Sequence, residues 1–234
     1  MKGTSAIKAE LAGFKENELI FASRLYREKL SGAVGEAAYY KALERMCKSG
    51  ELVRVAKGIY HLPKKSKYGI VPPSESEIIA AFTRNGTGTV VGNSLYNMLG
   101  LTTQIPKTVQ VMSSVLDEFS KTVRNIVVHR SLLNYDKDVE NMVHGLDVFQ
   151  NFDSIQDIDY KAFVDYSRNF AEHYNDEILE QVISSEKYKK STLSFMQDIL
   201  NFYKINNNLG KHLSSMSKYK HPKMEEIYEA ARIG

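Results

Sequence analysis

The sequence predicts an α+β fold in two parts: an N-terminal winged helix-turn-helix, followed by a mixed α/β, largely helical C-terminal domain. Three observations lead to this prediction. Helical apolar periodicity recurs three times before residue 50 and is followed by a hairpin pattern. A proline-rich break separates this region from the rest. Charge divides at the same place, because residues 1–69 hold 14 Lys/Arg and seven Asp/Glu, a net +7, whereas residues 70–234 hold 17 and 21, a net −4.

The N-terminal elements follow in the order helix, helix, turn, helix, hairpin. Apolar residues at three- and four-residue spacing predict helices over about residues 5–15, 21–30 and 34–48. Two short strands follow across residues 52–60, with Lys57-Gly58 as their turn. The stretch from Pro63 to Pro73 holds three prolines and excludes a helix interior. We therefore predict domains of residues 1–68 and 69–234.

The third helix carries the features that a DNA-recognition helix needs. One face is apolar and would pack on the first two helices, while the opposite face holds hydrogen-bond donors that can reach base edges or phosphates in a major groove. The hairpin carries two further cations that would touch the DNA backbone or minor groove. The predicted DNA-binding residues are Tyr40, Lys41 and Arg45 on the helix, with Arg54 and Lys57 in the hairpin.

Two alternatives to DNA binding stay open at this point. Any amphipathic surface helix has an apolar stripe and a charged front, and Glu44 within this front would repel phosphate. The N-terminal part could therefore be a winged-helix protein-interaction adaptor that never binds DNA. The second alternative is a nucleic-acid-processing enzyme appended to a winged helix. The basic charge of the first 69 residues favours a polyanionic partner over the adaptor.

The C-terminal part alternates a few strands with many helices. Ser74 and Glu77 have capping-box spacing at the start of a helix. A glycine-rich turn is predicted over residues 85–92, a short helix over 93–99, and strands over 108–114 and 124–130. From about residue 136 the periodicity is mostly helical, including a last helix over 223–233.

The run Asn-Met-Leu-Gly-Leu-Thr-Thr-Gln-Ile-Pro, residues 97–106, predicts a helix-to-strand corner. Glycine ends the helix, the threonine hydroxyls can bond local backbone, and proline blocks further helix before the next strand. A structural role explains the run, although a functional surface is the alternative. The corner residues are Asn97, Gly100, Leu101, Thr102, Thr103, Gln104 and Pro106.

This run also resembles the N-x-LGLSTQVP hallmark of AbiEi-like antitoxins, the transcriptional regulators of type IV toxin–antitoxin and abortive-infection systems. Gly58-Ile59-Tyr60 followed by Pro63 is similar to the end of the wing in those proteins. The resemblance covers roughly residues 20–130. This chain departs from the pattern at Thr102, where the hallmark has Ser, and at residues 92–94, where Gly-Asn-Ser replaces a Ser-Gly or Pro-Ser-Gly.

The resemblance implies a function that composition does not show. Members of that family bind operator inverted repeats through the winged helix and repress their own operon. Their C-terminal domain counteracts a nucleotidyltransferase-type toxin encoded in the same operon, often without a stable complex. We therefore expect operator DNA and such a toxin as partners, and a homodimer or cooperative pair on DNA.

Catalytic patterns are absent from the sequence. The six histidines show no helical metal-pair spacing, and residues 85–88, Asn-Gly-Thr-Gly, lack the Lys-Ser/Thr end of a P-loop. We expect no catalytic residue, no metal and no cofactor. Cys47 is the only cysteine, and no signal-peptide pattern or apolar run of membrane-spanning length occurs, which predicts a cytoplasmic protein with no membrane partner.

An acidic stretch over residues 151–180 suggests a surface that faces the toxin. A nucleic-acid-acting toxin usually has a basic groove, which acidic side chains on its antagonist would complement. The alternative interpretation is that these acidic side chains form an ordinary solvent-exposed face that favours solubility. The three residues chosen for the toxin-facing surface are Asp153, Asp157 and Asp159.

Overall fold

The computed structural model describes residues 2–214 and 216–233 of the chain and shows a mixed α+β protein. Its contacts divide it into two compact units, Met1–Ala81 (unit 1) and Phe82–Gly234 (unit 2). This division lies 13 residues beyond the predicted boundary at 68/69. The proline-rich stretch does not separate the units, because it folds into a hairpin and leads directly into the helix α4 (Glu75–Thr83).

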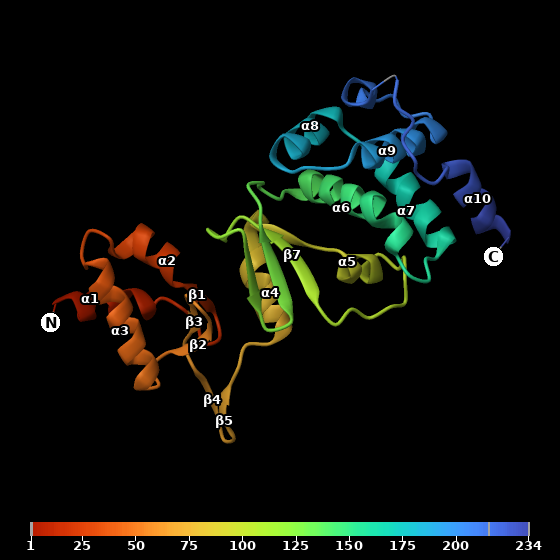
Figure 1. Ribbon diagram of the computed structural model, residues 1–234. Helices are drawn as coiled ribbons and strands as arrows, with labels where there is room; N and C mark the ends of the chain where they lie inside the picture. Colours follow the sequence, from red (N-terminus) through yellow and green to blue (C-terminus); the bar gives the residue numbers. More distant parts are fainter. Residues whose placement is uncertain (1, 215, 234) are drawn as a thin grey trace. The chain divides into compact units, whose positions relative to one another are not determined.

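Unit 1 combines three helical segments with a small antiparallel sheet. The three predicted helices are confirmed, at α1, at α2 continued by the π-helix η1, and at α3. The sheet has the order β1-β3-β2, in which β1 is a strand that the sequence analysis missed. Figure 1 shows these elements in red and orange. Their bounds are α1 Lys2–Leu11, β1 Leu19–Phe21, α2 Ala22–Leu25, η1 Tyr26–Leu30, α3 Glu36–Lys48, β2 Val53–Ala56 and β3 Ile59–His61.

The core of unit 1 comes from the apolar faces of its helices. Ile7 and Leu11 of α1, Leu25 of α2 and Leu43 of α3 are all buried in it. A second hairpin follows, formed by β4 (Lys64–Ser66) and β5 (Gly69–Val71), and all six strand residues are exposed. The stretch is not a helix interior, as predicted, but the sequence analysis missed its two strands, whose pairing the flanking prolines do not interrupt.

Helix α4 begins with the predicted capping box. The Glu77 carboxylate accepts a hydrogen bond from the Ser74 backbone N–H at 2.7 Å, and the Ser74 hydroxyl accepts one from the Glu77 N–H at 3.2 Å. Two N–H groups that no helical carbonyl can reach are thereby satisfied. This local pairing explains why the start of α4 could be placed from the sequence.

Unit 2 contains a four-stranded mixed sheet in the order β6-β7-β9-β8. β7 and β9 pair in parallel, whereas the other two pairs are antiparallel. The predicted strands at β7 and β9 are confirmed. β6 lies where a glycine-rich turn was expected, and β8 lies between the two predicted strands, where no strand was expected. The elements that form the sheet and its connections are η2 Arg84–Gly86, β6 Gly88–Val91, α5 Asn93–Met98, β7 Val109–Ser113, β8 Ser120–Val123 and β9 Ile126–Arg130.

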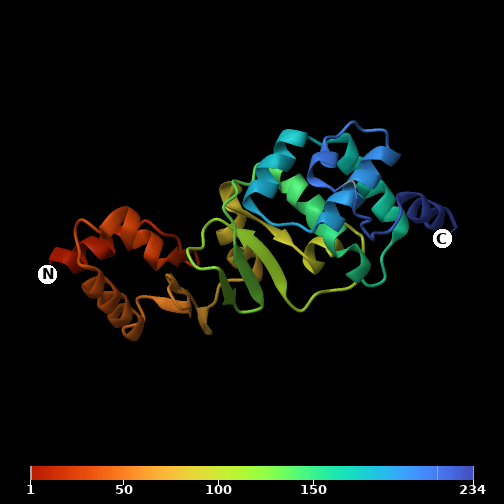
Figure 2. The same cartoon turned by 45° about the horizontal axis from the view of Figure 1, so that its top comes forward.

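The remainder of unit 2 is helical, as predicted. Helix α6 contacts β6 and also packs on α7, α8 and α9, so the helices gather on one side of the sheet (Figures 1 and 2). Helix α10 packs on α7 and α9. The bounds are α6 Lys137–Asn151, η3 Phe152–Ser154, α7 Tyr160–Glu172, α8 Asp176–Ser185, α9 Lys190–Phe202, η4 Leu209–His212 and α10 Met224–Ile233.

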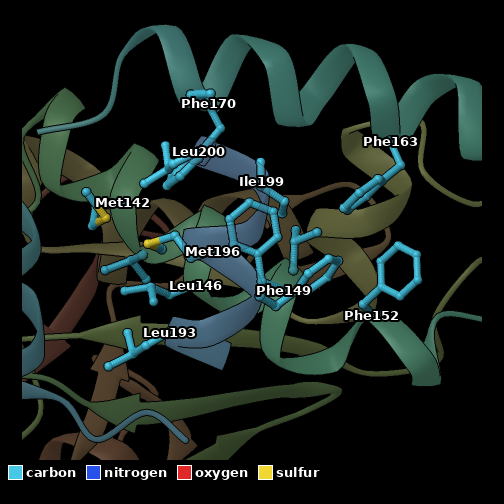
Figure 3. Packing of buried hydrophobic residues seen from close by; sticks show 14 of the residues in the cluster. Met142, Leu146, Phe149, Phe152, Phe163, Phe170, Leu193, Met196, Ile199 and Leu200 are labelled. Atoms are coloured by element: carbon cyan, nitrogen blue, oxygen red, sulfur yellow. The ribbon is translucent and has the colours of Figure 1, made fainter. Parts of the chain in front are cut away.

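Aromatic rings form the centre of the unit 2 core. Phe149 of α6 packs edge-on against Phe170 of α7, with ring centroids 5.0 Å apart, and Figure 3 labels both rings. Phe149 also packs edge-on against Phe195 of α9, with centroids 5.7 Å apart. Gly145 leaves room for the Phe170 ring of α7, since a Cβ there would come within 2.2 Å of this ring. Across residues 2–214 and 216–233, no helix is both long and apolar enough to cross a bilayer.

Candidate nucleic-acid interface

Helix α3 is held rigidly by its apolar face. Tyr39, Ala42, Leu43 and Met46 are buried, which matches the predicted back of the helix. The Tyr39 hydroxyl donates a hydrogen bond to the Ala22 carbonyl at 3.1 Å, and burial raises the pKa of this phenol. The helix therefore cannot rotate without losing both packing and a buried hydrogen bond, and its outer face is presented in one orientation.

The outer face of α3 is cationic. Glu44 and Lys48 form an exposed ion pair at 2.7 Å, and the hydrogen bond from Lys48 lowers the pKa of Glu44. This pair offsets the acidic residue that would repel phosphate. Lys41 and Arg45 are exposed beside it, and in the described part of the chain neither forms an ion pair. The Arg45 Nε donates to the Lys41 carbonyl at 3.3 Å, so the guanidinium lies along the helix.

Tyr40 adds an aromatic ring to one flank of this face. The side chain is 36% exposed, and its ring packs edge-on against the buried Tyr39 ring with centroids 5.1 Å apart. This contact restricts the ring while leaving part of it open to solvent.

The hairpin β2–β3 brings a fourth cation close to α3. Arg54 is paired in register with Tyr60, and its Nε donates to the Ala56 carbonyl at 3.4 Å. Burial raises the pKa of the Cys47 thiol, and the positive charge of Arg54 opposes that rise, which places Arg54 near this half-buried residue of α3. A raised pKa does not suit a nucleophilic cysteine.

The predicted turn between these strands carries Lys57. The turn is anchored to the rest of unit 1, because the Ala22 N–H donates to the Gly58 carbonyl at 2.9 Å. Lys57 is exposed, and within the described residues it forms no ion pair. The structure thus brings together, on one unit, an ordered cationic helix face and a hairpin with two cations.

The predicted helix-to-strand corner in unit 2 is built from side-chain hydrogen bonds. The Asn97 amide donates to the Thr102 and Gln104 carbonyls, both at 3.3 Å. The Thr102 hydroxyl accepts from the Gln104 N–H at 3.2 Å and donates to the Gln156 carbonyl at 2.7 Å. Leu101 is fully buried. Gly100 has φ +71°, Thr103 is exposed, and Pro106 is half-buried before β7.

The three aspartates chosen for an acidic surface are exposed, and two have structural partners. Asp157 accepts a hydrogen bond from the Gln104 side-chain amide at 2.7 Å, which joins it to the corner. Asp159 caps α7 by accepting from the Ala162 N–H at 2.9 Å. Asp153 lies on the short helix η3. Helix capping and turn bonding explain part of this acidic pattern without a partner.

Unit 2 also contains a partly buried polar network that the sequence did not indicate. The Thr89 hydroxyl donates to the Glu140 carboxylate at 2.5 Å and lies 2.7 Å from the His144 Nε2. Asp147 accepts from the Gly92 N–H at 2.7 Å. Burial lowers the pKa of His144 and raises the pKa of Asp147. The members of this network on α6, Glu140, His144 and Asp147, recur at four- and three-residue spacing. Their partners Thr89 and Gly92 lie more than 50 residues earlier in the chain, so no local sequence pattern connects them.

A cavity of about 160 Å³ lies beside this network and is lined by α6, α7 and the start of α8. Its polar lining consists of Asp138, Asn141, His144, Asn169, His173 and Asn175. Over the residues that the structure describes, no three His, Cys, Asp or Glu side chains are grouped to hold a metal ion.

A family described as "Family of unknown function (DUF6088)" matches residues 15–140, more than half of the sequence. The chain belongs to this family. The DUF6088 match begins before β1 and ends inside α6, so it includes the cationic face of α3, both hairpins and the corner.

Curated proteins give no match to this DUF6088 chain. Among solved structures, the chain is similar to the crystal structure of the RV2827C protein from Mycobacterium tuberculosis, with a TM-score of 0.42 and 12% sequence identity. That similarity covers 86% of this chain and 77% of the other.

Proposed function

We propose that the chain is a DNA-binding transcriptional autorepressor whose unit 1 is a winged helix-turn-helix. The observation that carries the proposal is the outer face of α3, where Lys41 and Arg45 remain unpaired within the described residues while Glu44 is neutralised by Lys48. Helix α3 would enter a major groove with this face, and the β2–β3 hairpin would lie on the flanking backbone. Phosphate contacts give affinity, and base contacts give specificity.

The second half of the proposal follows from the resemblance to AbiEi-like antitoxins. Unit 2 would counteract a nucleotidyltransferase-type toxin encoded in the same operon, in the cytoplasm and without catalysis of its own. Repression would be steric, with dimers or cooperative pairs on inverted repeats over the promoter. The exposed Asp153 is the acidic residue best placed to test for direct contact with the toxin, because Asp157 and Asp159 also serve the fold.

Electrophoretic shift of the full chain on DNA from its own promoter, at 50 and 200 mM salt, tests the DNA-binding half. We expect specific binding that weakens with salt. The variant Lys41→Ala/Arg45→Ala should lose about 1–3 kcal/mol for each bidentate base contact removed, or about 0.9 units of salt slope for each phosphate contact removed.

A matched control removes the same formal charge from the same unit. Lys8 and Arg24 are held in ion pairs by Glu51 and Glu28, at 2.6 and 2.8 Å, so Lys8→Ala/Arg24→Ala should bind DNA nearly as well as the unaltered chain. An equal loss in both variants would mean that only bulk charge matters. Absence of binding at low salt would favour the protein-interaction adaptor.

Coexpression with the toxin of the adjacent gene tests the antitoxin half separately. Growth should be restored by the full chain and also by Lys41→Ala/Arg45→Ala, because repression and neutralisation reside in different units. Failure of the unaltered chain to restore growth would refute the antitoxin role and leave DNA binding intact.

A further inference from the structure

The exposed hairpin β4–β5 carries basic, aromatic and aliphatic side chains that do not pack in the core of unit 1. Eight residues, 64–71, hold three lysines and no acidic residue. Tyr68 at the tip is 87% exposed, and Ile70 is 50% exposed. An isolated two-stranded hairpin is marginally stable in water, and exposed aromatic and aliphatic side chains add no stability there. A surface of this kind is typical of a binding element.

The tip of the hairpin is fixed by its own hydrogen bonds. The Ser66 hydroxyl accepts from the Tyr68 N–H at 3.1 Å and donates to the Gly69 carbonyl at 3.0 Å. The Lys67 ammonium lies 4.8 Å from the centre of the Tyr68 ring. The loop is therefore held in one conformation, with a cation and an aromatic ring together at its end.

The charge of the hairpin indicates the class of partner. Lys65 and Lys67 are exposed and form no ion pair in the described residues, whereas Lys64 is close enough to Glu77 to help lower the pKa of that carboxyl. Two cations without an ion-pair partner in the described residues, beside an exposed aromatic ring, suit a polyanion that also offers flat apolar surface, as sugar and base edges do in a nucleic acid.

We propose that the β4–β5 hairpin is a second DNA-contacting arm, in which Lys65 and Lys67 bind phosphates and Tyr68 packs against the sugar edge of a groove. The proposal rests on the DNA-binding function proposed above and extends the interface beyond α3 and the β2–β3 hairpin. Figure 1 shows the hairpin projecting from the small sheet of unit 1. Each strand has three residues and spans about 10 Å, which is comparable with the width of about 12 Å of a major groove.

The test uses the full chain and a fluorescein-labelled 40-base-pair duplex taken from directly upstream of its own reading frame. The arm variant is Lys65→Ala/Lys67→Ala, and a second variant is Tyr68→Ala. The charge-matched control is Lys218→Ala/Lys220→Ala, which removes two exposed lysines from unit 2. All substituted side chains are exposed, so circular dichroism should show unchanged folding.

We expect the arm variant to lower the salt slope of binding by about 1.8 units, from two phosphate contacts at about 0.9 units each. Between 50 and 200 mM salt, its affinity should therefore fall about 12-fold less than that of the unaltered chain. Tyr68→Ala should weaken binding with an unchanged salt slope. Hydroxyl-radical footprinting of the arm variant should lose protection at the same flank of each half-site, while the rest of each half-site stays protected.

Four outcomes would overturn the proposal. Arm variants that bind like the unaltered chain, while Lys41→Ala/Arg45→Ala does not bind, would remove the arm and leave the proposed function standing. An equal effect of the unit 2 control would show that the hairpin has no special role. A change in sedimentation of Tyr68→Ala without DNA, with normal DNA binding, would make the hairpin a self-association element. No binding by the unaltered chain would remove the arm together with the proposed function.

Discussion

Replacing Thr102 by valine tests whether the LGLTTQIP run is a structural corner or a functional surface. The side chain is 6% exposed, and its hydroxyl connects the Gln104 N–H to the Gln156 carbonyl. Valine keeps the shape but removes both hydrogen bonds. Because Gln104 and Gln156 are exposed residues, water can partly replace the lost partner, and we expect a cost of about 1–2 kcal/mol rather than the full penalty for two buried groups.

The neighbouring Thr103 provides the control, because it is exposed and allows the same chemical change. Thr103→Val should alter stability by less than about 0.5 kcal/mol. Urea unfolding measured by circular dichroism gives the free energies, and hydrogen–deuterium exchange of β7 peptides assigns the change to unit 2. For a unit of this size, the melting temperature of Thr102→Val should fall by roughly 2–8 °C.

Equal stability of the two variants would refute this reasoning, because it would show that the hydrogen bonds of Thr102 do not hold the corner. Loss of toxin neutralisation in Thr103→Val with unchanged stability would point instead to a functional surface.

Three further predictions follow from unit 2. Gly145→Ala should destabilise the protein by about 1–3 kcal/mol, because the new Cβ would overlap the Phe170 ring. In a double-mutant cycle measured by urea unfolding, Phe170→Leu should recover part of this loss. Burial lowers the pKa of His144 below its usual 6.5, so the unfolded chain binds a proton at this histidine more readily than the folded chain does. The free energy of unfolding should therefore fall as the pH drops below about 6.5, and it should depend less on pH in His144→Gln. Asp153→Lys should weaken neutralisation if unit 2 contacts the toxin, whereas unchanged growth rescue would remove the acidic surface from the mechanism.

Local patterns predicted most of the helices. Helix α3 was predictable because its buried residues recur at three- and four-residue spacing, and the capping box located the start of α4 from two residues. The short strands depend on distant partners. β1 is only three residues long, and Ile20 pairs with Tyr60, 40 positions away, so no local signal specifies it.

The predicted glycine-rich turn was wrong over β6, because glycine does not always mark a turn. Gly88 was assigned to a turn, although it lies in a strand where a Cβ would come within 2.3 Å of the Met112 carbonyl and 2.5 Å of the Phe82 carbonyl. The residue is small because two backbone segments approach it closely. The cations of α3 were found from the sequence because one helix carries them, whereas the Thr89–His144 network joins segments whose proximity only folding creates.

The DUF6088 segment ends inside α6, so a chain cut or recombined at its edge would lose most of this helix. Thr89, Gly92 and Thr102 lie within the matched segment, but their partners His144, Asp147 and Gln156 lie beyond residue 140. In residues 15–140 alone, the Gly92 N–H and the Thr102 hydroxyl would lose these acceptors, and Thr89 would keep only Glu140 as a partner. We therefore expect residues 15–140 not to fold as an independent module, so that a recombinant joined at residue 140 would need other helices to cover this part of unit 2.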